Sequence, residues 1–214
     1  MSGAPDHVPG SRPAPWTPVP LETERLLLRP LEPDDAGRIR ELAGASEVAD
    51  TTLLIPHPYP PGAAEAFIAQ AREWGERGVE HVFAVTLKAS GELVGCIGLR
   101  VDPVHARGEL GYWIGVPYWR HGYASEAVCR IVDLALGTLC LHRLHASCFT
   151  RNAASARVLE KAGLIREGVL RGHVRRFGRF EDLAVYGLVR EGAREVVGEE
   201  SAELRTHDDR TTPR

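Results

Sequence analysis

Residues 109–127 decide the fold, and they read ELGYWIGVPYWRHGYASEA. The first part of this segment, Glu109 to Val116, is mainly apolar and predicts a β-strand. Gly122 and the small Ala124 follow and mark a tight turn, after which we expect a helix from about Gly122 to Leu136. One short segment therefore predicts a strand, a tight turn and the start of a helix.

The expected turn has the chemistry of an anion-binding site. Gly122 has no side chain and Ala124 has a small one, so an anion can approach the backbone closely. The first amide groups of a helix have no partner within it, and the helix dipole adds positive potential there. The turn therefore suits a pyrophosphate, and the side chains of Arg120 and His121 could supply further donors.

Other phosphate-binding loops are not supported by the sequence. It contains no GxxxxGK followed by Ser or Thr, which argues against a Walker-type nucleotide site. It also contains no GxGxxG that opens a βαβ unit, which argues against a dinucleotide-binding fold.

Strands and helices alternate on both sides of this segment. Upstream, apolar patterns and turn residues predict one strand, two helices and two strands joined by the Ser90-Gly91 turn. Downstream, they predict a strand, a helix that ends at Gly163 and an antiparallel hairpin. The predicted segments are Arg25–Leu31, helices opened by Pro33 and by Pro61, His81–Lys88, Glu92–Val101, His142–Phe149, Asn152–Ala162, Leu164–His173 and Phe180–Val189.

This order of elements favours an α/β fold of the α+β type. We expect a mixed, mostly antiparallel sheet of six to seven strands with helices on both faces. One parallel crossover would run through the helix that begins near Gly122. Residues 21–190 would form a single domain, while the proline-rich residues 1–20 and the charged residues 191–214 are predicted to be disordered tails.

Composition limits the classes of function. The 214 residues carry a formal net charge of −3 at pH 7, which gives no reason to expect general affinity for nucleic acids or membranes. No apolar run approaches the ~20 residues of a transmembrane helix. No signal peptide is visible near the N-terminus, so a cytoplasmic location is expected. The cysteines lack a CxxC pair, which indicates reduced thiols; they are Cys96, Cys129, Cys140 and Cys148.

Several segments resemble the GNAT superfamily of N-acetyltransferases. Trp119 to Ala124 resembles the pyrophosphate signature of this family, Gln/Arg-x-x-Gly-x-Gly/Ala, with Trp119 at the Gln/Arg position. The wider pattern is similar to the branch that includes ribosomal-protein alanine and serine N-terminal acetyltransferases. The segments that carry this similarity are Thr23–Pro30, Glu109–Ala127, Asn152–Ser155 and Leu159–Gly163, within a resemblance that covers about Leu21 to Val189.

The resemblance implies a site for acetyl-CoA, which is a co-substrate of the reaction. Acetyl-CoA would lie in a V-shaped opening between the strands at Glu109–Val116 and His142–Phe149. Its pantetheine arm would bond to the backbone of Ile114 and Val116. An amide near Trp113 or Ile114 would polarise the thioester carbonyl.

The resemblance places the pyrophosphate on the turn that follows. The backbone amides expected to bind it, beside Trp119, are those of Arg120, His121, Gly122, Tyr123, Ala124 and Ser125. The alternative is that the strand glycines Gly111 and Gly115 only relieve crowding and mark no binding site.

Transfer to an amine requires that the amine be neutral when it attacks. At pH 7 the deprotonation of an α-amine with a pKa of about 7.8 costs about 1 kcal/mol, whereas lysine at about 10.4 costs about 4.6 kcal/mol. An α-amine therefore needs only weak help from a base. Glu109 is the candidate base, directly or through a water, and a salt bridge to a neighbouring arginine is its alternative role.

The leaving thiol needs little help from an acid, because its thiolate departs readily. Many family members place a tyrosine where this chain has Leu159, and Ser155 is the substitute in this branch. Ser155 could donate a proton to the sulfur, or it could bond only to the backbone of its own helix. Asn152 would contact the pantetheine or cap the same helix.

No metal is implied by the sequence. His142 and His145 are three residues apart on a predicted strand, so their side chains face opposite sides and do not form a metal-binding pair.

A protein N-terminus is the leading acceptor, and a small amine such as an aminoglycoside or a polyamine is the alternative. Both a monomer and a homodimer are compatible with the sequence. A basic cluster in the last hairpin could recognise an acidic acceptor or the 3′-phosphate of CoA, or could be solvated; it contains Arg171, His173, Arg175, Arg176 and Arg179. Two weaker alternatives are a non-catalytic acyl-CoA-binding module and a nucleic-acid-binding protein that uses this cluster.

Overall fold

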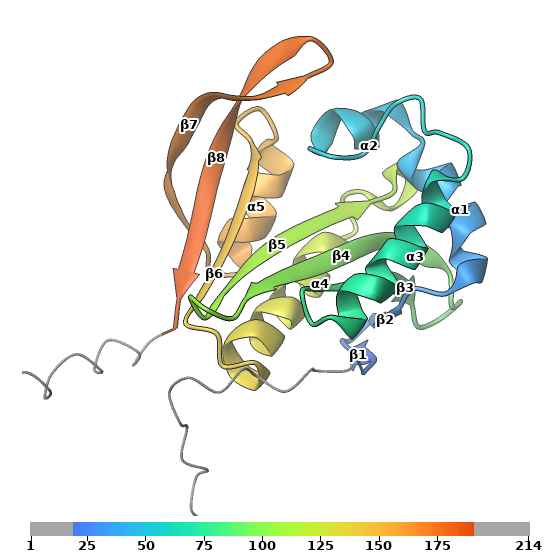
Figure 1. The fold of residues 1–214 in the computed structure, drawn as a ribbon, viewed down its shortest axis with the longest axis horizontal. Coiled ribbons are helices and arrows are strands. Elements are labelled where there is room, and N and C mark those ends of the chain that lie inside the picture. Colours follow the sequence, from blue (N-terminus) through green and yellow to red (C-terminus); the bar gives the residue numbers. More distant parts are fainter. Residues whose placement is uncertain (1–18, 191–214) are drawn as a thin grey trace, which may run out of the picture.

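The computed structural model describes residues 19–190, so residues 1–18 and 191–214 of the two predicted tails lie outside the described residues. Eight strands form one sheet (Figure 1). The strands are β1 (Leu21–Glu22), β2 (Leu26–Pro30), β3 (Glu80–Leu87), β4 (Leu93–Asp102), β5 (Arg107–Ile114), β6 (Arg143–Phe149), β7 (Ile165–Arg176) and β8 (Arg179–Val189).

The order of strands in the sheet is β1-β2-β3-β4-β5-β6-β8-β7. Every neighbouring pair is antiparallel except β5 and β6, which run parallel. The mostly antiparallel sheet with one parallel crossover is therefore confirmed. The predicted count of six to seven strands was one too low, because β1 is only two residues long and has no alternating pattern to identify it.

Within residues 19–190, five α-helices accompany the sheet: α1 (Ala36–Ala43), α2 (Ser46–Thr51), α3 (Ala63–Glu76), α4 (Tyr123–Asp133) and α5 (Ala153–Lys161). A 3-10 turn at Pro33–Asp35 leads into α1, and a π-helical turn at Leu134–Thr138 extends α4. The short helix α2 was not predicted from the sequence. None of the helices in the described part of the chain is long and apolar enough to cross a membrane.

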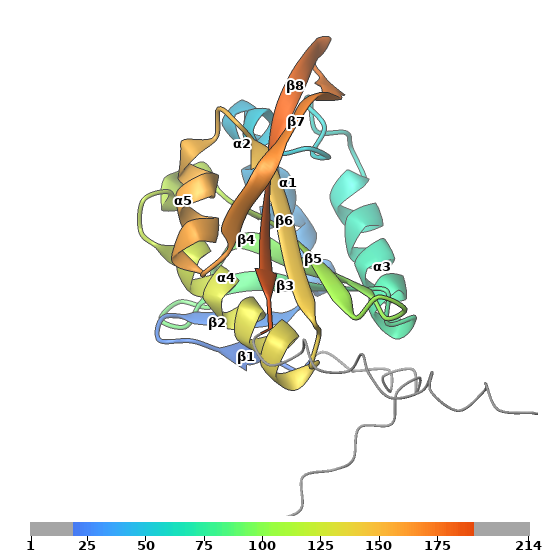
Figure 2. The ribbon, with the colours of Figure 1, turned by 90° about the vertical axis from the view of Figure 1, so that its left-hand side faces the viewer.

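Helices cover both faces of the sheet, as predicted. Figure 2 shows α1 and α3 on one side of the strands and α4 and α5 on the other. Ile39 of α1 and Ile68 of α3 pack in one apolar cluster with strand residues such as Cys96. Ile131 of α4 and Leu159 of α5 pack in a second, larger cluster. Each fully buried aliphatic side chain of this kind contributes roughly 1.5–3 kcal/mol to folding.

The sheet opens between β5 and β6. The two strands pair only from Arg107–Glu109 to Arg143–His145. Beyond these residues β5 stays paired with β4 as far as Ile114, and β6 stays paired with β8 as far as Phe149. The strands therefore diverge from a vertex beside Glu109, which confirms the predicted V-shaped opening.

Candidate active site

The opening exposes one backbone edge of β5. The amide of Gly115 donates to Val94 O at 2.8 Å, and successive residues of an antiparallel strand point their backbone groups to alternate sides. The backbone groups of Tyr112 and Ile114 consequently face away from β4 and into the opening. The amide of Trp113 faces β4, so of the two amides considered for the thioester carbonyl only that of Ile114 faces the opening.

The side chain of Trp119 bridges the strand and the turn that follows it. Its indole Nε1 donates to Ile114 O at 2.6 Å, and its backbone amide donates to Val116 O at 3.1 Å. Ile114 and Val116 are the residues whose backbone was expected to bind the pantetheine arm. The carbonyl oxygen of each therefore already accepts one hydrogen bond from Trp119. Because a carbonyl oxygen has two lone pairs, each can still accept a second bond.

The predicted anion turn has the expected geometry. Gly122 immediately precedes α4 with a φ of 85°, and Arg120 also adopts a left-handed conformation with a φ of 65°. Such a conformation costs a non-glycine residue about 1–2 kcal/mol. No described side chain caps this end of α4, so the first amides of the helix, those of Tyr123, Ala124 and Ser125, are available to a ligand.

The hydroxyl groups of two residues, Tyr112 and Ser155, lie close together at the opening. The phenolic oxygen of Tyr112, on β5, lies 2.8 Å from Oγ of Ser155, in the first turn of α5. Burial raises the pKa of Tyr112 well above its ordinary value, although the bond to Ser155 opposes this effect. Burial also raises the pKa of the Cys148 thiol, which lies beside Ser155. At neutral pH the phenol of Tyr112 and the thiol of Cys148 are therefore protonated.

Asn152 caps the same helix. Its side-chain Oδ1 accepts a hydrogen bond from the amide of Ser155 at 3.0 Å. Of the two roles considered for Asn152, capping is therefore present in the structure. The cap also fixes the position of the Ser155 backbone relative to β6.

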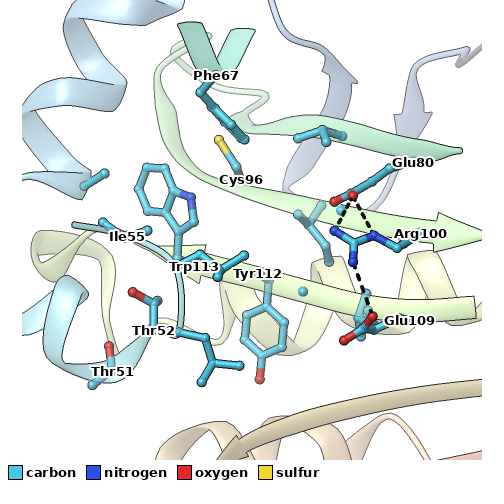
Figure 3. A pocket seen from close by; sticks show the side chains of 18 of the residues that line it. Thr51, Thr52, Ile55, Phe67, Glu80, Cys96, Arg100, Glu109, Tyr112 and Trp113 are labelled. Carbon is cyan, nitrogen blue, oxygen red and sulfur yellow. Dashed lines mark hydrogen bonds and ion pairs between the residues drawn. The ribbon is translucent and has the colours of Figure 1, made fainter. Parts of the chain in front are cut away.

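A pocket of about 650 Å³ extends from this pair of hydroxyls toward α3, and Figure 3 shows its wall. Its lining includes Ser155 and Cys148, and also Phe67 and Trp74 of α3. Most of the remaining lining is apolar or uncharged. The charged side chains among the described lining residues are Glu80, Arg100 and Glu109.

These three charged residues form a chain along the wall of the pocket (Figure 3). Arg100 contacts Glu80 Oε2 at 3.0 Å through both Nε and Nη2. Its Nη1 is 3.8 Å from Glu109 Oε2, which is an ion pair without a direct hydrogen bond. Glu109 is thus only loosely paired, and its side chain is 48% exposed. The salt bridge to an arginine, which was the alternative role predicted for Glu109, is therefore present. The carboxylate of Glu109 is also accessible from the pocket.

Arg151 and Arg176 form a clamp that joins α2 and the segment after it to the C-terminal part of the chain. Arg151 Nη1 contacts Asp50 Oδ2 at 2.7 Å. Arg176 Nη2 donates to Ala49 O at 2.9 Å and also to Ile55 O, and Ile55 lines the pocket. Burial lowers the pKa of Arg176. Arg176 therefore holds a wall of the pocket, whereas the other residues of the basic cluster are exposed.

A family model described as the acetyltransferase (GNAT) domain matches residues 25–165 of this sequence. The chain belongs to the GNAT acetyltransferase family. It is 34% identical over 176 residues to YoaA of Bacillus subtilis, described as an uncharacterized N-acetyltransferase, covering 79% of this chain and 96% of YoaA. It is 28% identical over 169 residues to YdaF of the same organism, described as a candidate ribosomal N-acetyltransferase, covering 78% and 92% of the two chains.

The fold of this GNAT enzyme is also that of RimL, a ribosomal L7/L12 α-N-protein acetyltransferase solved in complex with coenzyme A. The TM-score is 0.74 at 14% identity, over 80% of this chain and 98% of RimL. At this level of identity the similarity concerns the fold alone. The family and the sequence relatives make this chain an N-acetyltransferase.

The GNAT structure brings some of the predicted site residues together and leaves others apart. Glu109, Trp113 and Ser155 line one pocket. Trp113 packs its side chain against the apolar cluster of α1 and α3. Ile114, Val116 and the turn residues 119–125 lie outside the lining of that pocket, along the continuation of β5 into α4.

Two residues at the GNAT site, Tyr112 and Arg176, were not predicted from the sequence. The contact of Tyr112 with Ser155 joins positions 43 residues apart, and no local pattern signals it. The clamp residue Arg176 was grouped with a basic cluster because its sequence neighbours are exposed arginines.

Within residues 19–190 no group of three or more His, Cys, Asp or Glu side chains could hold a metal ion. All four cysteines are free thiols.

Proposed function

We propose that this GNAT enzyme transfers the acetyl group of acetyl-CoA to the N-terminal α-amine of a protein. The observation that carries the proposal is the opening between β5 and β6, which joins an anion turn to a pocket containing Glu109 and Ser155. The relation to YdaF supports a protein acceptor, because that relative is described as a candidate ribosomal N-acetyltransferase.

The described residues fit acetyl-CoA, which supplies the activated acetyl thioester. The free amides at the start of α4 suit its pyrophosphate, because a helix N-terminus offers both unpaired donors and positive potential. The unpaired edge of β5 suits its amide-containing arm, which can add to the edge as a strand would. The amide of Ile114 would then polarise the thioester carbonyl.

Glu109 would accept the proton that the acceptor amine loses, directly or through a water. Its loose pairing with Arg100 leaves carboxylate oxygen lone pairs open toward the pocket. The amine nitrogen forms a bond to the carbonyl carbon as the carbon–sulfur bond breaks. Weak base assistance is sufficient for an α-amine, because about a tenth of it is already neutral at pH 7.

Ser155 would donate a proton to the departing sulfur. Its hydroxyl is held in place by Tyr112, and its backbone is held by the side chain of Asn152. The phenol of Tyr112 would orient the Ser155 hydroxyl, because the two oxygens are within hydrogen-bonding distance. After CoA leaves, Ser155 would regain its proton from solvent.

A small-molecule amine is the alternative acceptor. The lining of the pocket argues against a polycation such as an aminoglycoside, because its charged residues are two carboxylates and one arginine. A site for several ammonium groups needs a carboxylate partner for most of them. A single amine attached to an apolar group fits this lining better.

The proposal is tested by thermal shift in the presence of acetyl-CoA, CoA, ATP and NAD. A ligand at about 100 times its dissociation constant stabilises a protein by about 2.7 kcal/mol, which corresponds to roughly 5–10 °C for a domain of this size. We expect a shift with acetyl-CoA and CoA only, followed by acetylation of N-terminal peptides in preference to aminoglycosides and polyamines. Absence of a shift with either coenzyme would reject the proposal.

A further inference from the structure

The segment that joins β1 to β2 forms several hydrogen bonds to the carboxylate of Glu126, in the first turn of α4. Oε1 of Glu126 accepts hydrogen bonds from Thr23 Oγ1 at 2.5 Å and from the amide of Arg25 at 2.8 Å. Oε2 of Glu126 accepts a bond from Arg25 Nε at 2.8 Å and lies 2.7 Å from Arg25 Nη2. These contacts link two parts of the chain that are about a hundred residues apart in sequence.

Arg25 extends from Glu126 to the anion turn itself. Its Nη1 donates to His121 O at 3.0 Å. Its Nη2 lies 3.3 Å from the point where a Cβ on Gly122 would stand, and its guanidinium lies 4.8 Å from the centre of the Tyr123 ring. His121 stacks on the same ring, with centroids 5.6 Å apart. One side chain thus contacts three successive residues of the turn.

The charges explain why this arrangement suits an anion site. Burial opposes the ionisation of Glu126, but the bonds from Thr23 and Arg25 outweigh it and hold the pKa of this carboxyl below its ordinary value. An ionised carboxylate in the first turns of α4 would repel a pyrophosphate. The guanidinium of Arg25 lies between Glu126 and the turn and compensates this charge.

We propose that Arg25, anchored by Glu126, is a positioning residue for the pyrophosphate of acetyl-CoA. It fixes the backbone from His121 to Tyr123, so that the amides that follow the left-handed Gly122 converge on one anion. This inference rests on the proposed function, because it takes acetyl-CoA as the donor. It assigns a role to the segment Thr23–Arg25, which is far from the turn in sequence.

A comparison of two donors isolates this role. Pantetheine and S-acetylpantetheine contain the thiol arm but no pyrophosphate. We expect Arg25→Gln to weaken CoA binding in calorimetry by about tenfold, which corresponds to about 1.4 kcal/mol, and to raise the KM for acetyl-CoA to a similar degree. The dissociation constant of pantetheine, the KM for S-acetylpantetheine and the kcat with acetyl-CoA should remain unchanged.

Two further variants keep the test decisive. Arg25→Lys retains the charge but not the fork of donors, and should weaken CoA binding by an intermediate factor. Lys88→Gln is the matched control, because Lys88 Nζ contacts Glu22 Oε2 at 2.8 Å and Thr23 O at 2.6 Å and so holds the same segment without contacting the turn. This control should leave the binding of CoA unchanged.

The outcomes separate this inference from the proposed function. If Arg25→Gln weakens CoA and pantetheine by the same factor, or weakens neither, Arg25 does not position the pyrophosphate. An equal loss of CoA binding in Lys88→Gln would also overturn the inference, because the segment and not the arginine would then matter. If the unmodified protein binds no CoA, the proposed function itself fails.

Discussion

The hydroxyl oxygens of Tyr112 and Ser155 lie 2.8 Å apart, and Tyr112 also donates to the backbone oxygen of Ser155 at 3.3 Å. The first residue belongs to β5 and the second to α5, so the pair spans the opening of the sheet. At the position where many family members have a tyrosine, this chain has the fully buried Leu159. A phenol is nevertheless present beside Ser155, because Tyr112 supplies it from β5.

The pair should act as one unit in catalysis. Ser155→Ala is expected to lower kcat by about 10- to 100-fold with little change in KM, because a positioned acid contributes about this much or more to proton transfer. Tyr112→Phe should lower kcat by a smaller factor. The double variant should be no slower than Ser155→Ala, which steady-state kinetics can measure. Independent, multiplying losses would show that the two hydroxyls do not cooperate.

Removal of the candidate base should show in the dependence of rate on pH. Glu109→Gln is expected to depress kcat more at pH 6 than at pH 9, because an α-amine acceptor with a pKa of about 7.8 is already neutral at high pH. Arg100→Gln is the companion variant, since Arg100 pairs with both Glu80 and Glu109. An unchanged rate and pH profile in Glu109→Gln would exclude Glu109 as the base.

Stability should depend on pH through an ion pair that joins β2 to the 3-10 turn before α1. Arg29 donates to both carboxylate oxygens of Asp35, at 2.7 and 2.8 Å, and Asp35 is only 7% exposed. Burial raises the pKa of Asp35, but the bonds from Arg29 and from the amide of Glu32 outweigh this, and the pKa lies below its ordinary value. The stabilisation is therefore complete at neutral pH and is lost as the pH falls below about 4.

Asp35→Asn is accordingly expected to lower the free energy of unfolding by about 3 kcal/mol at pH 7, since it leaves the partly buried Arg29 without its partner. The difference from the unmodified protein should shrink as the pH is lowered toward 3. Urea unfolding at several pH values measures it. Asp34→Asn, on the exposed neighbour, serves as the control and should have almost no effect. A loss that is constant across this pH range would contradict the assignment.

The clamp should influence the acceptor and not the donor. Arg176→Gln removes the bonds to Ala49 O and Ile55 O, so the segment that lines the pocket loses an anchor. We expect the KM for the acceptor to rise about fivefold or more, while the KM for acetyl-CoA stays constant. The neighbouring Arg175→Gln is the control, because Arg175 is exposed. Equal effects of both variants would indicate a general charge effect of the hairpin.

The sequence predicted those features that local patterns specify. The segment from Glu109 to Ala127 identified β5, the anion turn and α4, because a mainly apolar run, Gly122 and the helix signals follow one another within a few residues. The parallel crossover followed from the order of the predicted elements, and the V-shaped opening followed from the family resemblance. The short elements β1 and α2 were missed, since neither is long enough to show a period.

Features that depend on contacts between distant segments were beyond local patterns. Arg25 was part of a recognised motif, but its partner Glu126 lies in another element and only the packed structure unites them. Arg176 resembled its exposed neighbours in sequence, although the register of the hairpin turns its side chain toward α2. Tyr112 was overlooked because the candidate acid was sought only on α5, where Leu159 and Ser155 lie, and the strand residue that faces α5 was not considered.

The short pairing of β5 with β6 divides the sheet into two plates. Strands β1 to β5 form one plate, and β6, β8 and β7 form the other. The plates share three residue pairs at the vertex. Beyond the vertex they are also linked by side-chain contacts such as those of Arg151 and Arg176 with α2 and that of Tyr112 with Ser155. A ligand that fills the opening would contact both plates and hold them in a fixed relative position. Amide hydrogen exchange should then slow in β8, although β6 separates this strand from the opening. Binding of the donor would thus reduce local unfolding in a strand that it does not touch.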